Sequence, residues 1–314
     1  MRTAFIEELS ELAGADPRIL LITGDLGFGV FDSFARRYPR QFLNAGVAEQ
    51  NMTGLATGLA LEGRIVFTYS IGNFPTLRCL EQIRNDAAYH DANVKVVCIG
   101  GGFSYGALGI SHHATEDISI LRALPGLTVV CPGDEWEVRQ ATRALVATPG
   151  TCYLRLDKSK APPTNGAQDA FRIGVARRVR EGADLTIAAT GGILEVALHA
   201  AEELATRHKV QTRILSVHTA KPLDAAAVVA AARETGGLLT LEEHTVEGGL
   251  GGAVAECLLE LGVIPKAFRR IGLRAGFSSA VGSQSYLRSL YGLDKAGVVA
   301  TALDVLRKKR GELC

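Results

Sequence analysis

Glu49 occupies the position in this chain that best suits chemistry. It follows an apolar stretch at residues 42–43 and the turn-forming Gly46, and we expect a helix to begin at Ala48. A carboxylate in the first turn of that helix lies at a strand-to-helix mouth, where α/β proteins bind ligands. A first-turn glutamate also complements the helix dipole without further function, so both interpretations stay open. The helix is expected to turn three leucines toward the core: Leu55, Leu59 and Leu61.

Two glycine-rich segments are further candidates for ligand contact. A predicted strand at residues 18–23 runs into the first, residues 24–29, which we interpret as a turn because it lacks the spacings of dinucleotide and P-loop sites. The second, residues 100–109, precedes His112 and His113. Two imidazoles without a third ligand at fixed spacing do not make a zinc site, and we expect no metal ligands on this chain.

The elements that position these residues alternate between strands and helices. Apolar stretches of four to eight residues separated by longer helical patterns predict a doubly wound, mostly parallel sheet. Periodicity is lost where Pro, Ser and Asn gather at residues 157–166, and the strand–helix pattern restarts near residue 184. We therefore predict an α/β domain at residues 1–160, a linker at 161–182 and a smaller α/β domain at 183–314.

Composition excludes several classes of protein. With 34 basic and 33 acidic residues, and one short basic cluster at residues 307–310, the chain offers no charged surface for nucleic acid or an anionic membrane. No apolar run reaches the length of a membrane span, and the first eighteen residues do not form a signal peptide. The six cysteines have no paired or metal-binding spacing, which predicts reduced thiols in a cytoplasmic protein.

Two longer stretches carry a family resemblance. NAGVAEQNMTGLATGLALEG and FPTLRCLEQIRNDAAYH resemble the pyrimidine-binding domain of the transketolase family, and the second half of the chain resembles the transketolase C-terminal domain. In that family the glutamate of a G-x-x-E-Q/H motif hydrogen-bonds the aminopyrimidine of thiamine diphosphate. The resemblance places this role on Glu49, because a positioned carboxyl can act in proton transfer.

The resemblance implies roles for other residues near the cofactor. Asp25 matches an aspartate that approaches the cofactor after the first strand. Tyr69 and Phe74 are candidates for packing on the pyrimidine, although aromatic residues most often serve the core. His244 is typical of the family, and we interpret it as structural or interface-forming.

Substrate-binding roles also follow from the resemblance. The family's Gly-Pro-Thr-His-Gln motif puts His112, with Ser111 before it, at the reacting carbonyl, where a neutral imidazole can donate to a developing alkoxide. Arg155 matches a phosphate-binding arginine, with an ordinary surface ion pair as the alternative. Arg78 matches an anion-binding arginine of deoxyxylulose phosphate synthases. Leu108 departs from the family, which has an acidic residue there, so the usual donor preference does not carry over.

A complete cofactor site is not expected on this chain. The Gly-Asp-Gly motif with a distal Asn, by which thiamine enzymes hold Mg²⁺ and the diphosphate, is absent from the sequence. We therefore expect the C-terminal subunit of a two-component transketolase, which moves a two-carbon ketol unit from a ketose or ketose phosphate to an aldose. Its N-terminal partner subunit would supply the Mg²⁺ ligands within a heterotetramer of two copies of each chain. The alternatives are a split deoxyxylulose-phosphate-synthase-like enzyme, the β chain of a 2-oxoacid dehydrogenase and a non-catalytic scaffold subunit.

Overall fold

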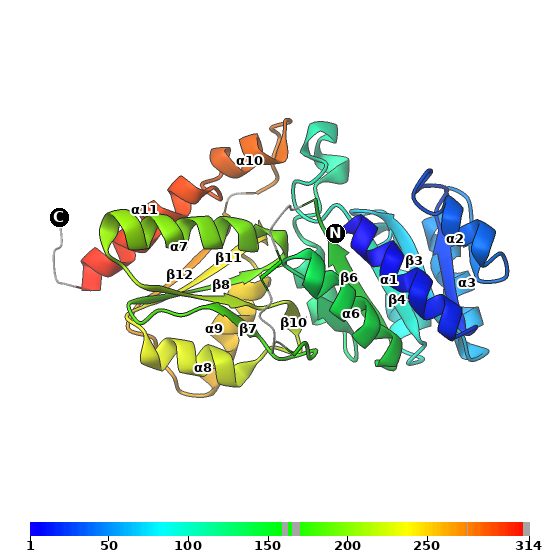
Figure 1. Cartoon of the computed structure of the whole chain (residues 1–314), viewed down its shortest axis with the longest axis horizontal. Helices are drawn as coiled ribbons and strands as arrows, with labels where there is room; N and C mark the ends of the chain where they lie inside the picture. The colour runs from blue at the N-terminus through cyan, green and yellow to red at the C-terminus, as the bar shows by residue number, and fades with distance from the viewer. Residues whose placement is uncertain (159–162, 165–169, 275, 310–314) are drawn as a thin grey trace.

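Two α/β domains lie side by side along the long axis of the molecule (Figure 1). The structure is a computed structural model that describes residues 1–158, 163–164, 170–274 and 276–309. Each domain has one mostly parallel sheet with helices on both faces, so the predicted fold class is confirmed. Residues 161–162 and 165–169 of the predicted linker, and residues 159–160 before it, lie outside the described residues.

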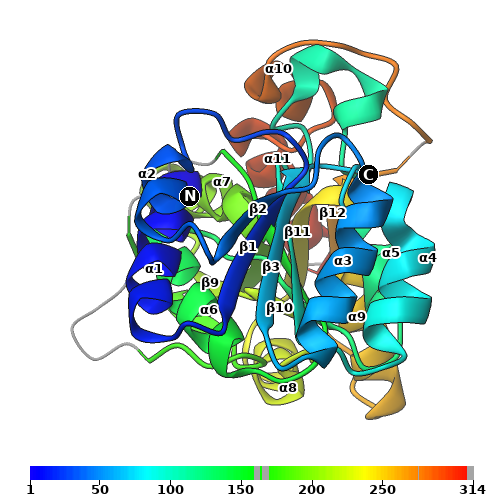
Figure 2. The ribbon, with the colours of Figure 1, turned by 90° about the vertical axis from the view of Figure 1, so that its right-hand side faces the viewer.

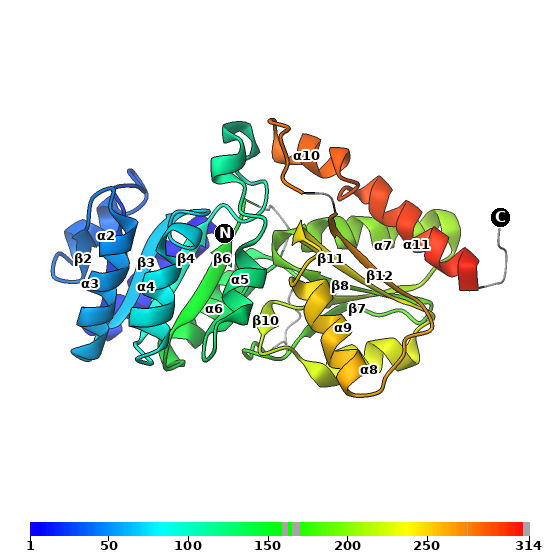
Figure 3. The same cartoon turned by 180° about the vertical axis from the view of Figure 1, so that it is seen from behind.

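The first domain is built on a seven-stranded sheet in the order β10-β5-β6-β4-β3-β1-β2. Its strands are mainly buried and apolar: β1 (Ile19–Thr23), β2 (Phe42–Asn44), β3 (Ile65–Ile71), β4 (Val94–Ile99), β5 (Thr128–Val130), β6 (Cys152–Leu156) and β10 (Thr219–Lys221). Helices α1 (Arg2–Ala15) and α6 (Glu135–Ala147) cover one face, and α3 (Glu49–Leu61), α4 (Leu80–Gln82) and α5 (Asp117–Ala123) cover the other (Figures 1 and 3). The short α2 (Asp32–Arg37) lies near the β2 edge (Figure 2).

The second domain has a five-stranded sheet in the order β12-β11-β8-β9-β7. Its strands are β7 (Arg177–Arg180), β8 (Leu185–Thr190), β9 (Thr212–Ser216), β11 (Leu238–Thr245) and β12 (Phe268–Leu273). Helices α7 (Leu194–His208) and α11 (Lys295–Lys309) pack together on one face, with α8 (Ala225–Glu234) and α9 (Leu250–Glu260) on the other. Helix α10 (Gln284–Leu290) lies above the sheet beside the loop of residues 100–112 (Figure 3).

The domain boundary is less simple than the sequence predicts. β7 lies within the predicted linker and pairs antiparallel with β9 at the edge of the second sheet. The sequence analysis did not predict this strand, because its arginine-rich sequence lacks the apolar pattern of a buried strand. β10 belongs by sequence to the second domain, yet it pairs antiparallel with β5 and completes the first sheet. A strand from the second half of the sequence therefore forms one edge of the first sheet.

The prediction for helix α3 needs correction. The helix buries Met52, Ala56 and Ala60, whereas Leu55 and Leu61 are exposed, because the small alanines allow the helix to approach the sheet closely. The segment between β3 and β4 is not one regular helix: it contains a 3₁₀ turn η1 (Leu77–Cys79), the short α4 and a π-helical segment η2 (Ile83–Ala88).

The described residues contain no helix that is both long and apolar enough to cross a bilayer. Four cysteines are buried free thiols, Cys79, Cys98, Cys131 and Cys152, and Cys257 is a partly buried one. Cys314 lies outside the described residues.

Candidate active site

Glu49 lies where the carboxyl ends of β1 and β3 meet the first turn of α3. Its side chain packs against Gly24, directly after β1, and is only 3 % exposed. Ser70 of β3 donates a hydrogen bond to Oε1 (3.2 Å), and Arg78 Nη1 donates to Oε2 (2.9 Å). In the sheet, β2 lies on one side of β1 and β3 on the other, and α3 carries the chain from β2 across to β3. Glu49 therefore lies at the topological switch point, where open α/β sheets bind ligands.

Arg78 joins Glu49 to the aromatic part of the site. It lies on the η1 turn, and its side chain is 46 % exposed. Its guanidinium lies over the Phe74 ring, 4.3 Å from the centroid. The Phe74 ring in turn meets the His112 ring edge-on, with centroids 5.1 Å apart. We call Glu49, Phe74, Arg78 and His112 the mouth cluster, because these contacts bring all four side chains together.

His112 ends a 3₁₀ turn, η4 (Ile110–His112), that projects from the carboxyl end of β4. Its Nδ1 lies 3.0 Å from the Ser111 hydroxyl. Partial burial, with a smaller effect from His113, lowers the pKa of His112 below its ordinary value of 6.5. The imidazole is therefore neutral at pH 7 and can donate or carry a proton. His113 is buried, with Nε2 3.2 Å from the Gly106 carbonyl oxygen, and serves the loop itself.

Asp25 and Tyr69 differ in their exposure to the site. Asp25 is exposed after β1 with φ at 56°, a left-handed conformation that few non-glycine residues adopt. Its carboxylate accepts a hydrogen bond from Asn44 Nδ2 (2.9 Å), which fixes it at the rim of the site. Tyr69 is 1 % exposed and packs against Phe5 and Phe31. Its ring therefore offers no face to a ligand, which corrects the expectation that it packs on a pyrimidine.

Arg155 is also displaced from the role that the sequence suggests. It is 2 % exposed, its Nε donates to Asp117 (2.8 Å), and its Nη2 donates to the carbonyl oxygens of Ala114 and Glu243 (2.9 and 3.0 Å). A guanidinium with these partners is not available to a substrate, and it is not a surface ion pair either. It joins the two domains instead.

A further cation lies near His112, and the sequence interpretation missed it: Lys158. Its Nζ lies 3.8 Å from the centroid of the Tyr105 ring, and Tyr105 neighbours His112 at 6.2 Å between ring centroids. Partial burial, and then the charge of Arg2, lowers the pKa of Lys158. Its place just after the end of β6 was the available signal, because residues beyond a strand's carboxyl end face the ligand side of the sheet.

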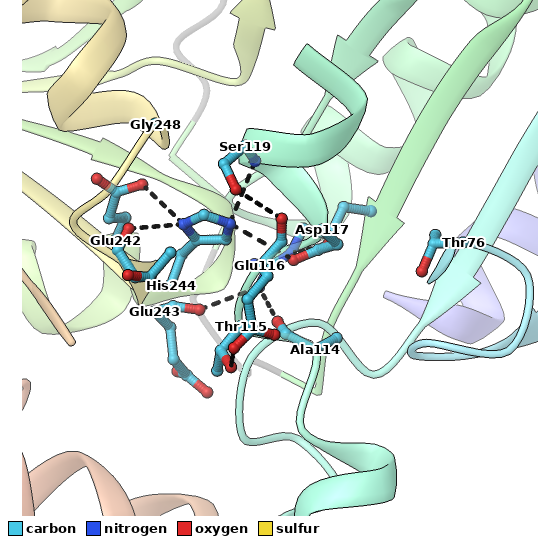
Figure 4. Close-up of polar contacts among 12 residues, drawn as sticks. Thr76, Ala114, Thr115, Glu116, Asp117, Ser119, Glu242, Glu243, His244 and Gly248 are labelled. Atoms are coloured by element: carbon cyan, nitrogen blue, oxygen red, sulfur yellow. Dashed lines mark hydrogen bonds and ion pairs between the residues drawn. The ribbon is translucent and has the colours of Figure 1, made fainter. Parts of the chain in front are cut away.

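A second set of charged residues lies where the domains meet, and we call Asp117, Arg155, Glu242, Glu243 and His244 the seam cluster. Figure 4 shows the part of this cluster around His244. His244 Nε2 accepts a hydrogen bond from the Ser119 amide (3.3 Å) and lies 4.0 Å from Asp117, while its Nδ1 lies 3.7 Å from Glu242. Burial raises the pKa of Glu242, although His244 and two backbone N–H groups oppose that effect. His244 is thus part of the interdomain contact.

Glycines make room for the seam cluster. A Cβ atom on Gly101 would lie 2.7 Å from the guanidinium carbon of Arg155, and one on Gly249 would lie 2.1 Å from a Glu242 oxygen. Gly102, at φ +62°, would place a Cβ 2.6 Å from Glu243. Gly101, Gly102 and Gly249 therefore allow the backbone to pack closely against the buried charges.

The described residues include no group of three or more His, Cys, Asp or Glu side chains that could hold a metal ion. Glu49 and Phe74 fit a planar, nitrogen-containing ring, since one supplies a carboxylate and the other a flat apolar face. The same residues offer nothing for a diphosphate with its Mg²⁺, which requires several oxygen ligands.

The fold defines a two-domain α/β protein with a buried carboxylate and an aromatic ring at the carboxyl end of its first sheet. Residues 1–164 match the family model for the transketolase pyrimidine-binding domain, and residues 174–298 match that for the transketolase C-terminal domain. The chain belongs to the transketolase family, and membership implies dependence on thiamine diphosphate.

Several relatives are subunits of similar length. The chain is 38 % identical to a subunit of the apulose-4-phosphate transketolase of Phocaeicola vulgatus, covering 98 % of this chain and 97 % of the relative. It is 39 % identical to a subunit of the 6-deoxy-6-sulfo-D-fructose transketolase of a Clostridium species, covering 98 % and 95 %. A solved split-gene transketolase, described as an inactive beta4 tetramer, superposes with a TM-score of 0.89 at 34 % identity, covering 98 % and 99 %.

Proposed function

We propose that this chain is the C-terminal subunit of a split transketolase, which transfers a two-carbon ketol unit from a ketose donor to an aldose acceptor. The observation that carries the proposal is the half-site at Glu49, which offers a carboxylate and an aromatic face to a pyrimidine, while the described residues hold no group of three or more His, Cys, Asp or Glu side chains for a metal ion. The partner subunit would hold the diphosphate and Mg²⁺, in a heterotetramer with two copies of each chain. Relatives named as subunits, matched over nearly their whole length, support this division.

Bound thiamine diphosphate would supply the carbon nucleophile and the electron sink. Glu49 holds the pyrimidine ring by a hydrogen bond and fixes its orientation, with Ser70 holding the carboxyl in place. His112, neutral and half-buried beside Phe74, donates to the oxygen of the donor's carbonyl and shuttles its proton.

The substrate class we favour is a ketose with an anionic group at its far end. The two relatives described above are named for a sugar phosphate and a sulfonated sugar. Lys158, over the Tyr105 ring and near His112, is the residue we assign to that group, in place of Arg155. Leu108 and Ile110 are exposed on the same loop and provide an apolar rim, which disfavours a hydroxyl at that point of the donor.

Two other functions compete with this proposal. A split deoxyxylulose-phosphate-synthase-like enzyme would use Arg78 for an anionic substrate, and it would consume a 2-oxoacid in place of a ketose. A scaffold subunit would not need a carboxylate held at the strand–helix mouth by two hydrogen bonds, as Glu49 is.

The test is to purify this chain alone and with a partner subunit that carries the Gly-Asp-Gly motif. We expect no ketol transfer by the single chain, and transfer that depends on thiamine diphosphate and Mg²⁺ by the pair. Cofactor with Mg²⁺ should raise the melting temperature of the pair and not that of the single chain. Ketol transfer without a partner, or a pair that uses only 2-oxoacid donors, would contradict the proposal.

A further inference from the structure

Arg78 makes the two contacts that a bound pyrimidine would make. Its N–H groups donate to Glu49, and its planar guanidinium stacks over Phe74 at 4.3 Å. A planar ring that bonds to the Glu49 carboxylate and packs on Phe74 would occupy the same space. Arg78 and the cofactor ring therefore compete for one position, and the guanidinium must leave it before the ring can bind.

The position of Arg78 allows that movement. Its side chain is nearly half exposed, and in the described part of the chain Glu49 is the one hydrogen-bond partner of its guanidinium. The Glu49 end of the ion pair is buried, but the Arg78 end reaches solvent, so the guanidinium can move into water when a ligand takes its place on the carboxylate. The η1 turn that carries Arg78 is also irregular, with a 3₁₀ turn followed by α-helical and π-helical segments.

A displaced guanidinium needs a new partner. A planar fork of N–H donors matches the oxygens of a phosphate, sulfonate or carboxylate group. We propose that Arg78 exchanges one anion for another: it pairs with Glu49 until a pyrimidine binds there, and then with an anionic group of the bound ligand. This inference rests on the proposed function and makes Arg78 a coupling and specificity residue. The anionic group belongs either to the sugar or to the cofactor's diphosphate.

The experiment compares the assembled enzyme with Arg78→Met, Arg78→Lys and the matched control Arg84→Met, an arginine on the same irregular helix whose side chain bonds to its neighbour Asn85. Affinities are measured for thiamine and for thiamine diphosphate, and KM for a ketose and for its phosphate. Arg78→Met should tighten thiamine binding several-fold because the competing ion pair is gone. Arg78→Lys should keep part of the competition, and Arg84→Met should change nothing.

The arms of the experiment identify the anion. If the sugar supplies it, Arg78→Met raises KM for the ketose phosphate by about tenfold and leaves KM for the unphosphorylated ketose unchanged. If the diphosphate supplies it, the preference for thiamine diphosphate over thiamine falls, while both KM values hold. Thiamine binding that is unchanged or weaker in Arg78→Met would overturn the proposal, as would equal losses for both sugars and both cofactor forms.

A measurement on the single chain separates this inference from the proposed function. Melting temperatures of Arg78→Met, Glu49→Gln and the double variant should be non-additive, because each single change removes the same ion pair. Additive shifts would contradict the pairing. The proposed function fails independently, if Glu49→Gln retains ketol transfer in the assembled enzyme.

Discussion

The mouth cluster and the seam cluster both place charged side chains near the carboxyl ends of parallel strands, but they differ in how completely those charges are satisfied. In the mouth cluster Arg78 has Glu49 as its one hydrogen-bond partner among the described residues, and it is half exposed. In the seam cluster Arg155 has a carboxylate and two carbonyl oxygens from both domains and is buried. Unused hydrogen-bonding capacity beside solvent marks groups available to a ligand, whereas complete satisfaction marks groups that fix the domains.

The seam cluster should respond most strongly to mutation. Arg155→Met leaves Asp117 as a buried carboxylate without its arginine counter-ion, and we expect it to lower the free energy of unfolding by about 3–5 kcal/mol. Urea denaturation of the single chain measures this loss. The matched control is Arg139→Met, which breaks a surface pair with Glu7 and should cost less than about 1 kcal/mol. Equal losses in the two variants would remove the distinction between the clusters.

Glu49→Gln should show the opposite profile, with large loss of activity and little loss of stability. An amide cannot replace a carboxyl in proton transfer, so turnover of the assembled enzyme should fall by about 10²-fold or more. Circular dichroism and melting of the single chain should stay close to the native values. Glu62→Gln, at the exposed end of the same helix, is the control. Near-normal turnover by Glu49→Gln would rule out its assigned role.

His112→Ala should lower kcat by about 10- to 100-fold and leave cofactor affinity unchanged, because we assign the imidazole to the substrate and not to the cofactor. The pH profile gives a second measurement. Since burial and His113 lower the pKa of His112, the neutral form persists through pH 7, and the acid limb of the activity profile should lie below the ordinary histidine value of 6.5. If His112→Ala still lost activity at the same low pH, the titrating group would be another residue.

Lys158→Met should have the smallest effect of the four. We expect KM for an anionic ketose to rise about tenfold, which corresponds to about 1.4 kcal/mol, with kcat little changed. Arg155→Lys, in an enzyme that still folds, should leave this KM unaltered. If Arg155→Lys raised KM and Lys158→Met did not, Arg155 and not Lys158 would be the residue that binds the anionic group of the ketose.

The fold class and the position of Glu49 were predictable, because long periodic strands and a motif at a strand exit carry local signals. The burial of Arg155 and Tyr69 was not predictable, because strands that are buried on both faces show no alternation of apolar and polar residues that would tell which side chains face solvent. The pairing of Arg78 with Glu49 was also beyond reach, since it joins residues 29 apart through tertiary packing. For the same reason the outer face of α3 was assigned wrongly at Leu55 and Leu61.

Strand β10 comes late in the sequence, and this has a consequence for folding during synthesis. Residues 219–221 cap the β5 edge of a sheet whose other strands all lie within the first 156 residues. During synthesis from the N-terminus that edge stays open until more than sixty further residues have emerged, and open strand edges invite pairing with other chains. A fragment that stops at the end of the first domain would keep this exposed edge permanently, so the two domains are one unit in folding even though they are two in sequence.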